Sequence, residues 1–198
     1  MLVFLAACAN WFGGGDTAGD SDDSGLAEDS GEVDTGELAA DDARVRALTE
    51  LPGGDSQCQA PMLVRVTYIT DGDTVNVEPE EGGAYFKVRL IGIDTPEIEH
   101  SPDPAECFSA EATAFTSDEL LDRLAWLTFD AECLDYYDRT LAYLIRGDGD
   151  SGFHNRVLAR NGYASALSVD PNTTFEREIA EDVAAARQAD AGLWENCR

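Results

Sequence analysis

Residues 63–77, LVRVTYITDGDTVNV, give the clearest indication of the fold of this protein. Apolar and polar side chains alternate over residues 63–69, and β-branched and aromatic types dominate, which is typical of a strand with one buried face. Asp71-Gly72-Asp73 then provides a turn, and the alternation resumes at Thr74. The stretch therefore predicts an antiparallel β-hairpin at the start of a folded domain.

The sequence after this hairpin predicts one more strand of a meander and then helices. Residues 84–93, AYFKVRLIGI, follow a Gly-Gly turn and predict the third strand. The spacing of apolar residues predicts helices over residues 109–124, 153–160 and 175–189. Further strands are expected over residues 127–131 and 141–145. This order of elements predicts a small α+β domain around a partly closed barrel.

The chain is strongly acidic, with 40 acidic and 13 basic side chains in 198 residues and a net charge of −27. Residues 1–57 hold 13 of the acids and two of the bases, which leaves −16 for residues 58–198. A charge of this size favours a soluble monomer and repels polyanions, so taken alone it argues against nucleic-acid binding. A surface rich in acids and poor in lysine is also found in salt-adapted proteins, and a saline habitat is one hypothesis.

The N-terminal region predicts an anchor followed by a linker. Residues 1–8, MLVFLAAC, are apolar but too short to span a bilayer. LAAC resembles a bacterial lipobox, which predicts a lipid on Cys8 and an exported, membrane-anchored protein; an apolar stub with an incidental cysteine is the alternative, because no basic residue precedes it. Residues 9–57 are rich in Gly, Asp and Ser without periodicity, so we expect a disordered acidic linker and a domain at 58–198.

Cysteine usage agrees with export. The chain has five cysteines, and setting Cys8 aside leaves Cys58, Cys107, Cys133 and Cys197. In an exported domain four thiols predict two disulfides, for which three pairings are possible. Four buried free thiols in a cytosolic protein are the alternative.

Three polar clusters lie at the ends of the expected strands: DGDT at 71–74, DTPE at 94–97 and DYYDR at 135–139. Each on its own fits a turn, a strand end or a surface arginine. In combination, their order and spacing resemble the staphylococcal nuclease family, whose signature is similar to VRLIGIDTPE at 88–97. The similarity continues at residues 110–115, 139–143, 155–162, 171–174 and 192–194, so it covers about residues 60–195.

The resemblance implies an α+β fold, a five-stranded OB-fold β-barrel with three helices. It implies a Ca²⁺-dependent nuclease that hydrolyses DNA and RNA and leaves 3′-phosphate ends. The implied Ca²⁺ ligands are the carboxylates of Asp73 and Asp94 and the backbone carbonyl of Thr95. Oxygen donors of this kind are what a hard cation prefers.

The resemblance also implies the residues that act on the phosphodiester. Glu97 matches the glutamate that positions or deprotonates the attacking water. Arg89 and Arg139 match the pair that contacts phosphate oxygens in the transition state. Tyr137 matches a tyrosine that hydrogen-bonds a terminal phosphate.

The chain departs from the family pattern outside this set. Leu167 and Val169 stand where a well-known member has two base-stacking tyrosines, and Tyr136 replaces a lysine. These changes put base stacking and long-range attraction of nucleic acid in doubt. His100 and His154 are expected at the surface or in the groove, because the mechanism needs no histidine. The rival hypotheses are a nuclease-like binding module without activity and a calcium-binding surface protein that uses the acidic tail.

Overall fold

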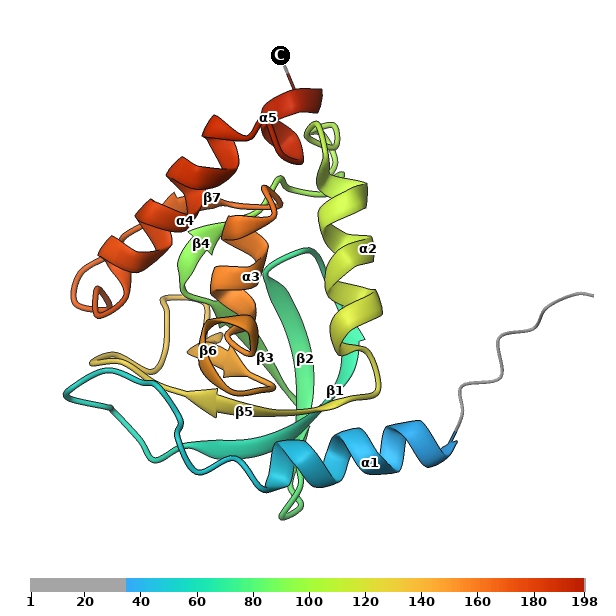
Figure 1. Ribbon diagram of the computed structural model, residues 1–198, viewed down its shortest axis with the longest axis vertical. Coiled ribbons are helices and arrows are strands. Elements are labelled where there is room, and N and C mark those ends of the chain that lie inside the picture. The colour runs from blue at the N-terminus through green and yellow to red at the C-terminus, as the bar shows by residue number, and fades with distance from the viewer. Residues whose placement is uncertain (1–34, 198) are drawn as a thin grey trace, which may run out of the picture. The chain divides into compact units, whose positions relative to one another are not determined.

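A computed structural model describes residues 35–197 (Figure 1). Its strands are β1 (Met62–Ile69), β2 (Thr74–Pro79), β3 (Phe86–Leu90), β4 (Gly92–Asp94), β5 (Leu124–Thr128), β6 (Thr140–Ile145) and β7 (Ser165–Leu167). Its helices are α1 (Thr35–Arg46), α2 (Ser109–Leu120), α3 (His154–Arg160), α4 (Glu176–Gln188) and α5 (Leu193–Asn196), with a short 3₁₀ turn at Gly149–Ser151. No helix within residues 35–197 combines the length and the apolar character needed to cross a bilayer.

Five strands close into a barrel in the order β1-β2-β3-β6-β5, which confirms the expected OB-fold barrel. All neighbours are antiparallel except β3 and β6, which run parallel with Arg89 opposite Leu141. The alternation expected from the sequence is present, since Val64, Val66, Val75 and Val77 all point into the interior and are fully buried. The three expected helices are α2, α3 and α4, and the structure adds α1 and the four-residue α5.

The expected third strand is broken at Ile91, so that β3 stays in the barrel while β4 leaves it to pair with β7. Gly92 has φ +84°, a left-handed conformation that glycine adopts without a steric penalty. A Cβ atom there would also lie 2.4 Å from Ile179 Cδ1 of α4. The break directs the end of β4, and with it Asp94, away from the barrel wall.

The expected disorder of residues 9–57 does not extend to residues 35–57, because these residues pack on the barrel. Val45 and Leu48 are buried, and Trp126 Nε1 of β5 donates a hydrogen bond to the Val45 carbonyl at 2.9 Å. Arg65 of β1 contacts Asp42 at 2.7 Å. Figure 1 shows α1 lying along the β1 and β5 side of the barrel. Residues 9–34 of the predicted linker and the anchor at 1–8 lie outside the described residues.

Two disulfides are present, as the sequence predicts, and the structure selects their pairing. Cys58 pairs with Cys133 and Cys107 pairs with Cys197, with Cα separations of 5.7 Å and 5.8 Å. The first joins the end of the N-terminal segment to the loop between β5 and β6. The second joins the segment before α2 to the C-terminal end of α5. Each closes a long loop and so restricts the unfolded chain strongly.

His154 departs from the expected surface position, since it is buried at the start of α3 and its ring stacks on Phe115 with centroids 6.2 Å apart. Its Nε2 atom has no hydrogen-bond partner. Burial, and secondarily the positive charge of Arg146, lower the pKa of His154 to about 3. His100, by contrast, is exposed as expected.

A stability measurement follows from this buried imidazole. It stays neutral in the folded chain, whereas the unfolded chain takes up the proton below its ordinary pKa of 6.5. Above pH 6.5 the protonation of His154 therefore costs no stability. As the pH falls from 6.5 towards 3, it lowers the free energy of unfolding by about 1.4 kcal/mol per pH unit. The free energy of unfolding can be measured in urea at pH 8 and at pH 5. Between these two pH values, His154→Leu is expected to gain about 2 kcal/mol of unfolding free energy relative to wild type. His100→Gln serves as the surface control, and an equal effect of His154→Leu at both pH values would contradict this assignment.

Candidate active site

The candidate site begins at the turn between β1 and β2, where Asp71 and Asp73 are both buried. The Asp73 N–H donates to Asp71 Oδ1 at 3.0 Å, which holds the two acids in one compact turn. A Cβ atom on Gly72 would lie 2.8 Å from Thr95 Oγ1, so only glycine allows Thr95 to approach this closely. The turn and the segment after β4 therefore pack directly against each other.

Asp73, Asp94 and Thr95 lie close together through two sets of contacts, and the N–H and hydroxyl of Thr95, not its carbonyl, contact Asp73. Asp73 Oδ2 accepts hydrogen bonds from the Thr95 N–H at 2.7 Å and from the Thr95 hydroxyl at 3.0 Å. The Arg89 guanidinium forms an ion pair with Asp73 and contacts Asp94 Oδ1 at 2.8 Å. One positive group thus joins the two carboxylates that the sequence assigns to a metal ion. No three His, Cys, Asp or Glu side chains within residues 35–197 are grouped as a set of metal ligands.

The charges around Arg89 show how acidic this centre is. Burial lowers the pKa of Arg89, while the carboxylates of Asp94 and Asp71 oppose that shift. Burial raises the pKa of Asp71 and, together with the negative charge of Asp71, that of Glu97. The carboxylates of Asp71, Asp73, Asp94 and Glu97 therefore all act on the Arg89 guanidinium. Two of them, Asp73 and Asp94, share direct contacts with it, and carboxylate oxygens are the donors that a hard divalent cation prefers.

Glu97 follows Pro96 on the long connection between β4 and α2 and is exposed. Its N–H donates to Glu106 Oε2 at 3.1 Å, and the Glu106 N–H donates to the Glu97 carbonyl at 2.9 Å. This reciprocal pair closes the base of the loop, and the adjacent Cys107 is bonded to Cys197. Glu106 is therefore a positioning residue that the sequence analysis missed. In the sequence, the only indication of this role is that Glu106 is an acidic residue shortly before α2.

Arg139 is held by Asp135, which lies four residues before it in the sequence. Asp135 Oδ2 accepts a hydrogen bond from Arg139 Nε at 2.6 Å, and Oδ1 accepts the N–H groups of Tyr137 and Arg139. Burial alone would raise the pKa of Asp135, but these hydrogen bonds outweigh burial and lower it. The carboxylate therefore stays ionised and fixes the guanidinium at its Nε edge. Tyr137 itself is exposed, with the Arg139 guanidinium carbon 5.7 Å from its ring centroid.

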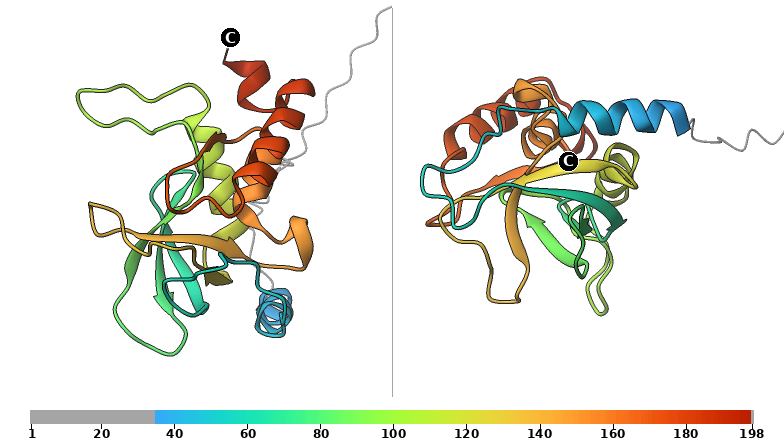
Figure 2. Two further views of the ribbon diagram at one scale, coloured as in Figure 1. Left: turned by 90° about the vertical axis from the view of Figure 1, so that its left-hand side faces the viewer. Right: turned by 90° about the horizontal axis from the view of Figure 1, so that it is seen from below.

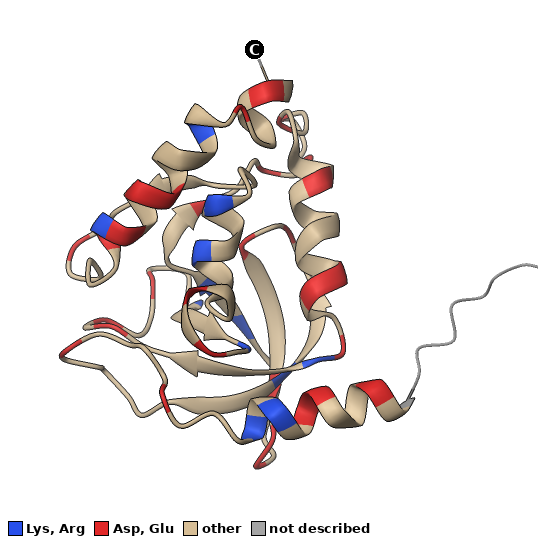
Figure 3. Cartoon of the chain, viewed as in Figure 1, with Lys and Arg blue, Asp and Glu red and all other residues tan. Residues whose placement is uncertain are grey.

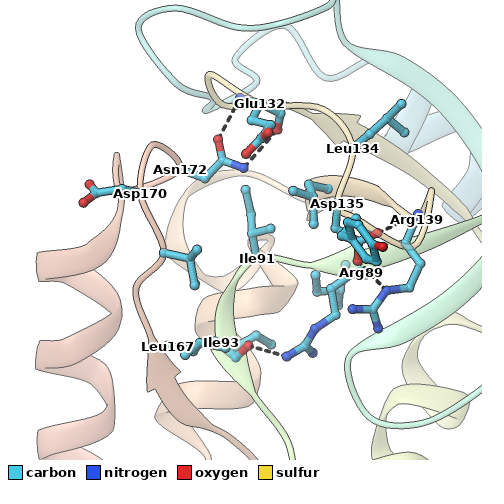
Figure 4. A pocket seen from close by; sticks show the side chains of 15 residues that line it. Arg89, Ile91, Ile93, Glu132, Leu134, Asp135, Arg139, Leu167, Asp170 and Asn172 are labelled. Atoms are coloured by element: carbon cyan, nitrogen blue, oxygen red, sulfur yellow. Dashed lines mark hydrogen bonds and ion pairs between the residues drawn. The ribbon is translucent and has the colours of Figure 1, made fainter.

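Arg89 and Arg139 line one cavity of about 540 Å³ between β3, β4, the loop before β6 and the loop after β7 (Figure 4). Leu134, Leu167 and Val169 form part of its wall. Asn172 closes one end, since its side chain is bonded to the Glu132 N–H and carbonyl at 2.8 Å and 2.9 Å. The cavity therefore combines two arginines with three acids, Glu132, Asp135 and Asp170, and an aliphatic wall.

Comparison with known proteins agrees with this geometry. A family model described as "Staphylococcal nuclease homologue" matches residues 87–196. The chain is 32% identical to a thermonuclease of Staphylococcus hyicus over 132 residues, which are 67% of this chain and 75% of that protein. It is 34% identical to a thermonuclease of Staphylococcus intermedius over 130 residues, covering 66% and 74% of the two chains. The matched segment and the barrel together show that this chain belongs to the staphylococcal nuclease family.

Proposed function

We propose that this chain is a Ca²⁺-dependent phosphodiesterase that hydrolyses DNA and RNA and leaves 3′-phosphate ends. The observation that supports this most is the Arg89 guanidinium, which contacts both Asp73 and Asp94 and lines the same cavity as Arg139. A phosphodiester resists attack because its negative charge repels nucleophiles. Groups that neutralise this charge at a fixed position therefore accelerate hydrolysis.

The residues divide this chemistry between them. Asp73 and Asp94, with the Thr95 carbonyl, would hold Ca²⁺, which when bound supplies positive charge to the phosphate oxygens. Arg89 and Arg139 donate hydrogen bonds to the non-bridging oxygens as negative charge accumulates there. Glu97 accepts the proton of the attacking water or orients that water, and the loop closed by Glu106 keeps it in place. Tyr137 binds a terminal phosphate at the exposed rim.

Metal dependence is the first test of this proposal. The full chain is expected to hydrolyse denatured DNA with Ca²⁺ and to lose that activity with EDTA. Mg²⁺ should substitute poorly, because it demands a tighter octahedral geometry than a mixed set of carboxylates and a carbonyl offers. Asp73→Asn should abolish the Ca²⁺ response, whereas Asp118→Asn on exposed α2 should keep it. Equal turnover in EDTA would refute the metal assignment, and no turnover under any condition would favour a binding module.

We propose in addition that the chain is exported and carries a lipid on Cys8, as a monomer. The two disulfides support export, because such bonds form and persist outside the reducing cytoplasm. Mass spectrometry of the mature protein tests this: a diacylglycerol mass on Cys8 is expected. An unmodified Cys8 in a protein recovered from the cytoplasm would overturn the anchor while leaving the nuclease proposal in place.

A further inference from the structure

The outer face of β1, β2 and β3 continues directly from the candidate active site. Val88 and Leu90 point into the barrel and are fully buried, so Lys87 and Arg89 point outward on the same face of β3. Lys87 lies opposite Asn76 of β2, and Asn76 lies opposite Tyr68 of β1. A row of outward side chains therefore crosses three strands one step away from Arg89.

Two large aromatic side chains on this face are exposed. Tyr68 is 60% and Tyr85 is 68% accessible to solvent. Tyr85 precedes β3 by one residue and stands two residues from Lys87 along the chain. The two tyrosines thus flank Lys87, one across β2 and the other along the chain towards the β2–β3 hairpin. Exposed aromatic rings beside a cation are the combination on which single-stranded nucleic acids stack.

Lys87 has an unusual charge environment for this chain. It is the one lysine in a sequence with 40 acids, it is exposed, and it forms no ion pair with any residue in 35–197. Arg65 of β1 and Arg146, which follows β6, differ, because Arg65 contacts Asp42 at 2.7 Å and Arg146 is bonded to Asp41. Figure 3 shows acids spread over α1, α2 and α4, whereas Lys87 lies on β3 opposite the uncharged Asn76. An unpaired ammonium group is free to bind a phosphate.

We propose that Tyr68, Tyr85 and Lys87 form a binding track for the single-stranded segment of substrate next to the cleaved phosphodiester. This inference rests on the nuclease activity proposed above. Lys87 and Arg89 are separated along β3 by about 7 Å, close to the spacing of neighbouring phosphates in an extended strand. With Arg89 at the reacting phosphate, Lys87 takes the next one, and the two rings stack on the bases that follow.

The arrangement of the loops supports this path. In Figure 2 (left) the loop after β4 and the loop before β6 project to the same side of the barrel, and the β2–β3 hairpin lies below them. A strand that leaves the cavity beside Arg89 therefore reaches the outer face of β3, on which Lys87 lies. The cavity loop offers Leu167 and Val169, whose side chains do not stack as aromatic rings do. The track supplies aromatic surface that this loop lacks. Glu78, which lies opposite Arg65 on the same face, is an acidic residue at the end of the track.

The test compares short and long substrates in the full chain. The substrates are a dithymidine phosphodiester and an oligothymidylate of about 16 nucleotides, the upper end of the length bound by one OB-fold. Wild type is expected to show a KM for the long substrate at least about fivefold below that for the short one, from stacking alone. In the double variant Tyr68→Leu/Tyr85→Leu that ratio should fall towards one. Fluorescence anisotropy of the labelled oligomer in EDTA should show the same loss of affinity without cleavage.

Charge is tested separately by Lys87→Ala. Loss of one phosphate contact should reduce the slope of log affinity against log salt by ~0.7 for a single strand. Arg177→Ala on α4 removes the same charge from an exposed, remote position and should leave the slope unchanged. The track is overturned if all track variants keep the wild-type salt slope and the wild-type KM ratio between short and long substrates. The nuclease proposal would stand in that case. Absence of cleavage by wild type would overturn the nuclease proposal, and absence of anisotropy change as well would overturn both.

Discussion

Replacing Glu97 by Gln is expected to lower kcat on denatured DNA by about 10²–10⁴-fold, the range for loss of a general base. Gln keeps the shape of the side chain but accepts no proton at neutral pH. The N–H and carbonyl contacts of residue 97 with Glu106 are made by the backbone, so the loop should keep its conformation. Ca²⁺ and substrate should still bind, and steady-state kinetics with calorimetric Ca²⁺ titration would measure both.

Glu99→Gln is the matched control, because it removes the same charge from an exposed position on the same loop. We expect its kcat to stay within about twofold of wild type, as for surface substitutions that touch no reacting group. A Glu97→Gln protein that binds Ca²⁺ and turns over at the wild-type rate would refute the assigned role of Glu97. The rival reading as a binding module would follow if wild type also bound DNA without cleaving it.

Arg139→Lys is expected to lower kcat by about 10²–10³-fold while KM rises much less, because the lost contacts form mainly in the transition state. Lysine keeps the positive charge but cannot bond Asp135 through one edge and a phosphate through the other. The ammonium group would be drawn to the ionised Asp135 and away from the cavity. Single-turnover rates and KM on the same substrate would separate the two effects.

The same substitution at Arg160 of α3 is the control, since Arg160 is bonded to Asp182 away from the cavity. Asp135→Asn tests whether Asp135 positions the Arg139 guanidinium, because it weakens the hydrogen bond at Nε but keeps the arginine. We expect Asp135→Asn to lower kcat by a smaller factor than Arg139→Lys. A KM that rises in proportion to the fall in kcat/KM for Arg139→Lys would show instead that Arg139 serves ground-state binding.

The pattern of the sequence predicts the barrel, and its resemblance to the nuclease family predicts the residues of the site. Alternation over residues 63–77 depends on neighbours two positions apart, so the first strands can be located from local pattern alone. The resemblance to the nuclease family assigns Asp73, Asp94, Thr95, Glu97, Arg89 and Arg139 to one site. All six lie within or next to β2, β3, β4 or β6.

Contacts between distant parts of the chain could not be predicted from local sequence pattern. The packing of residues 35–57 depends on Trp126, Arg65 and Arg146, which lie far along the sequence, and the polar segment shows no periodicity that predicts it. The pairing of the four cysteines, the burial of His154 and the ion pairs of Arg89 are contacts of the same long-range kind. A linear pattern records which side chains face the core. It does not show which distant segments contact each other, since those contacts depend on the packing of the whole domain.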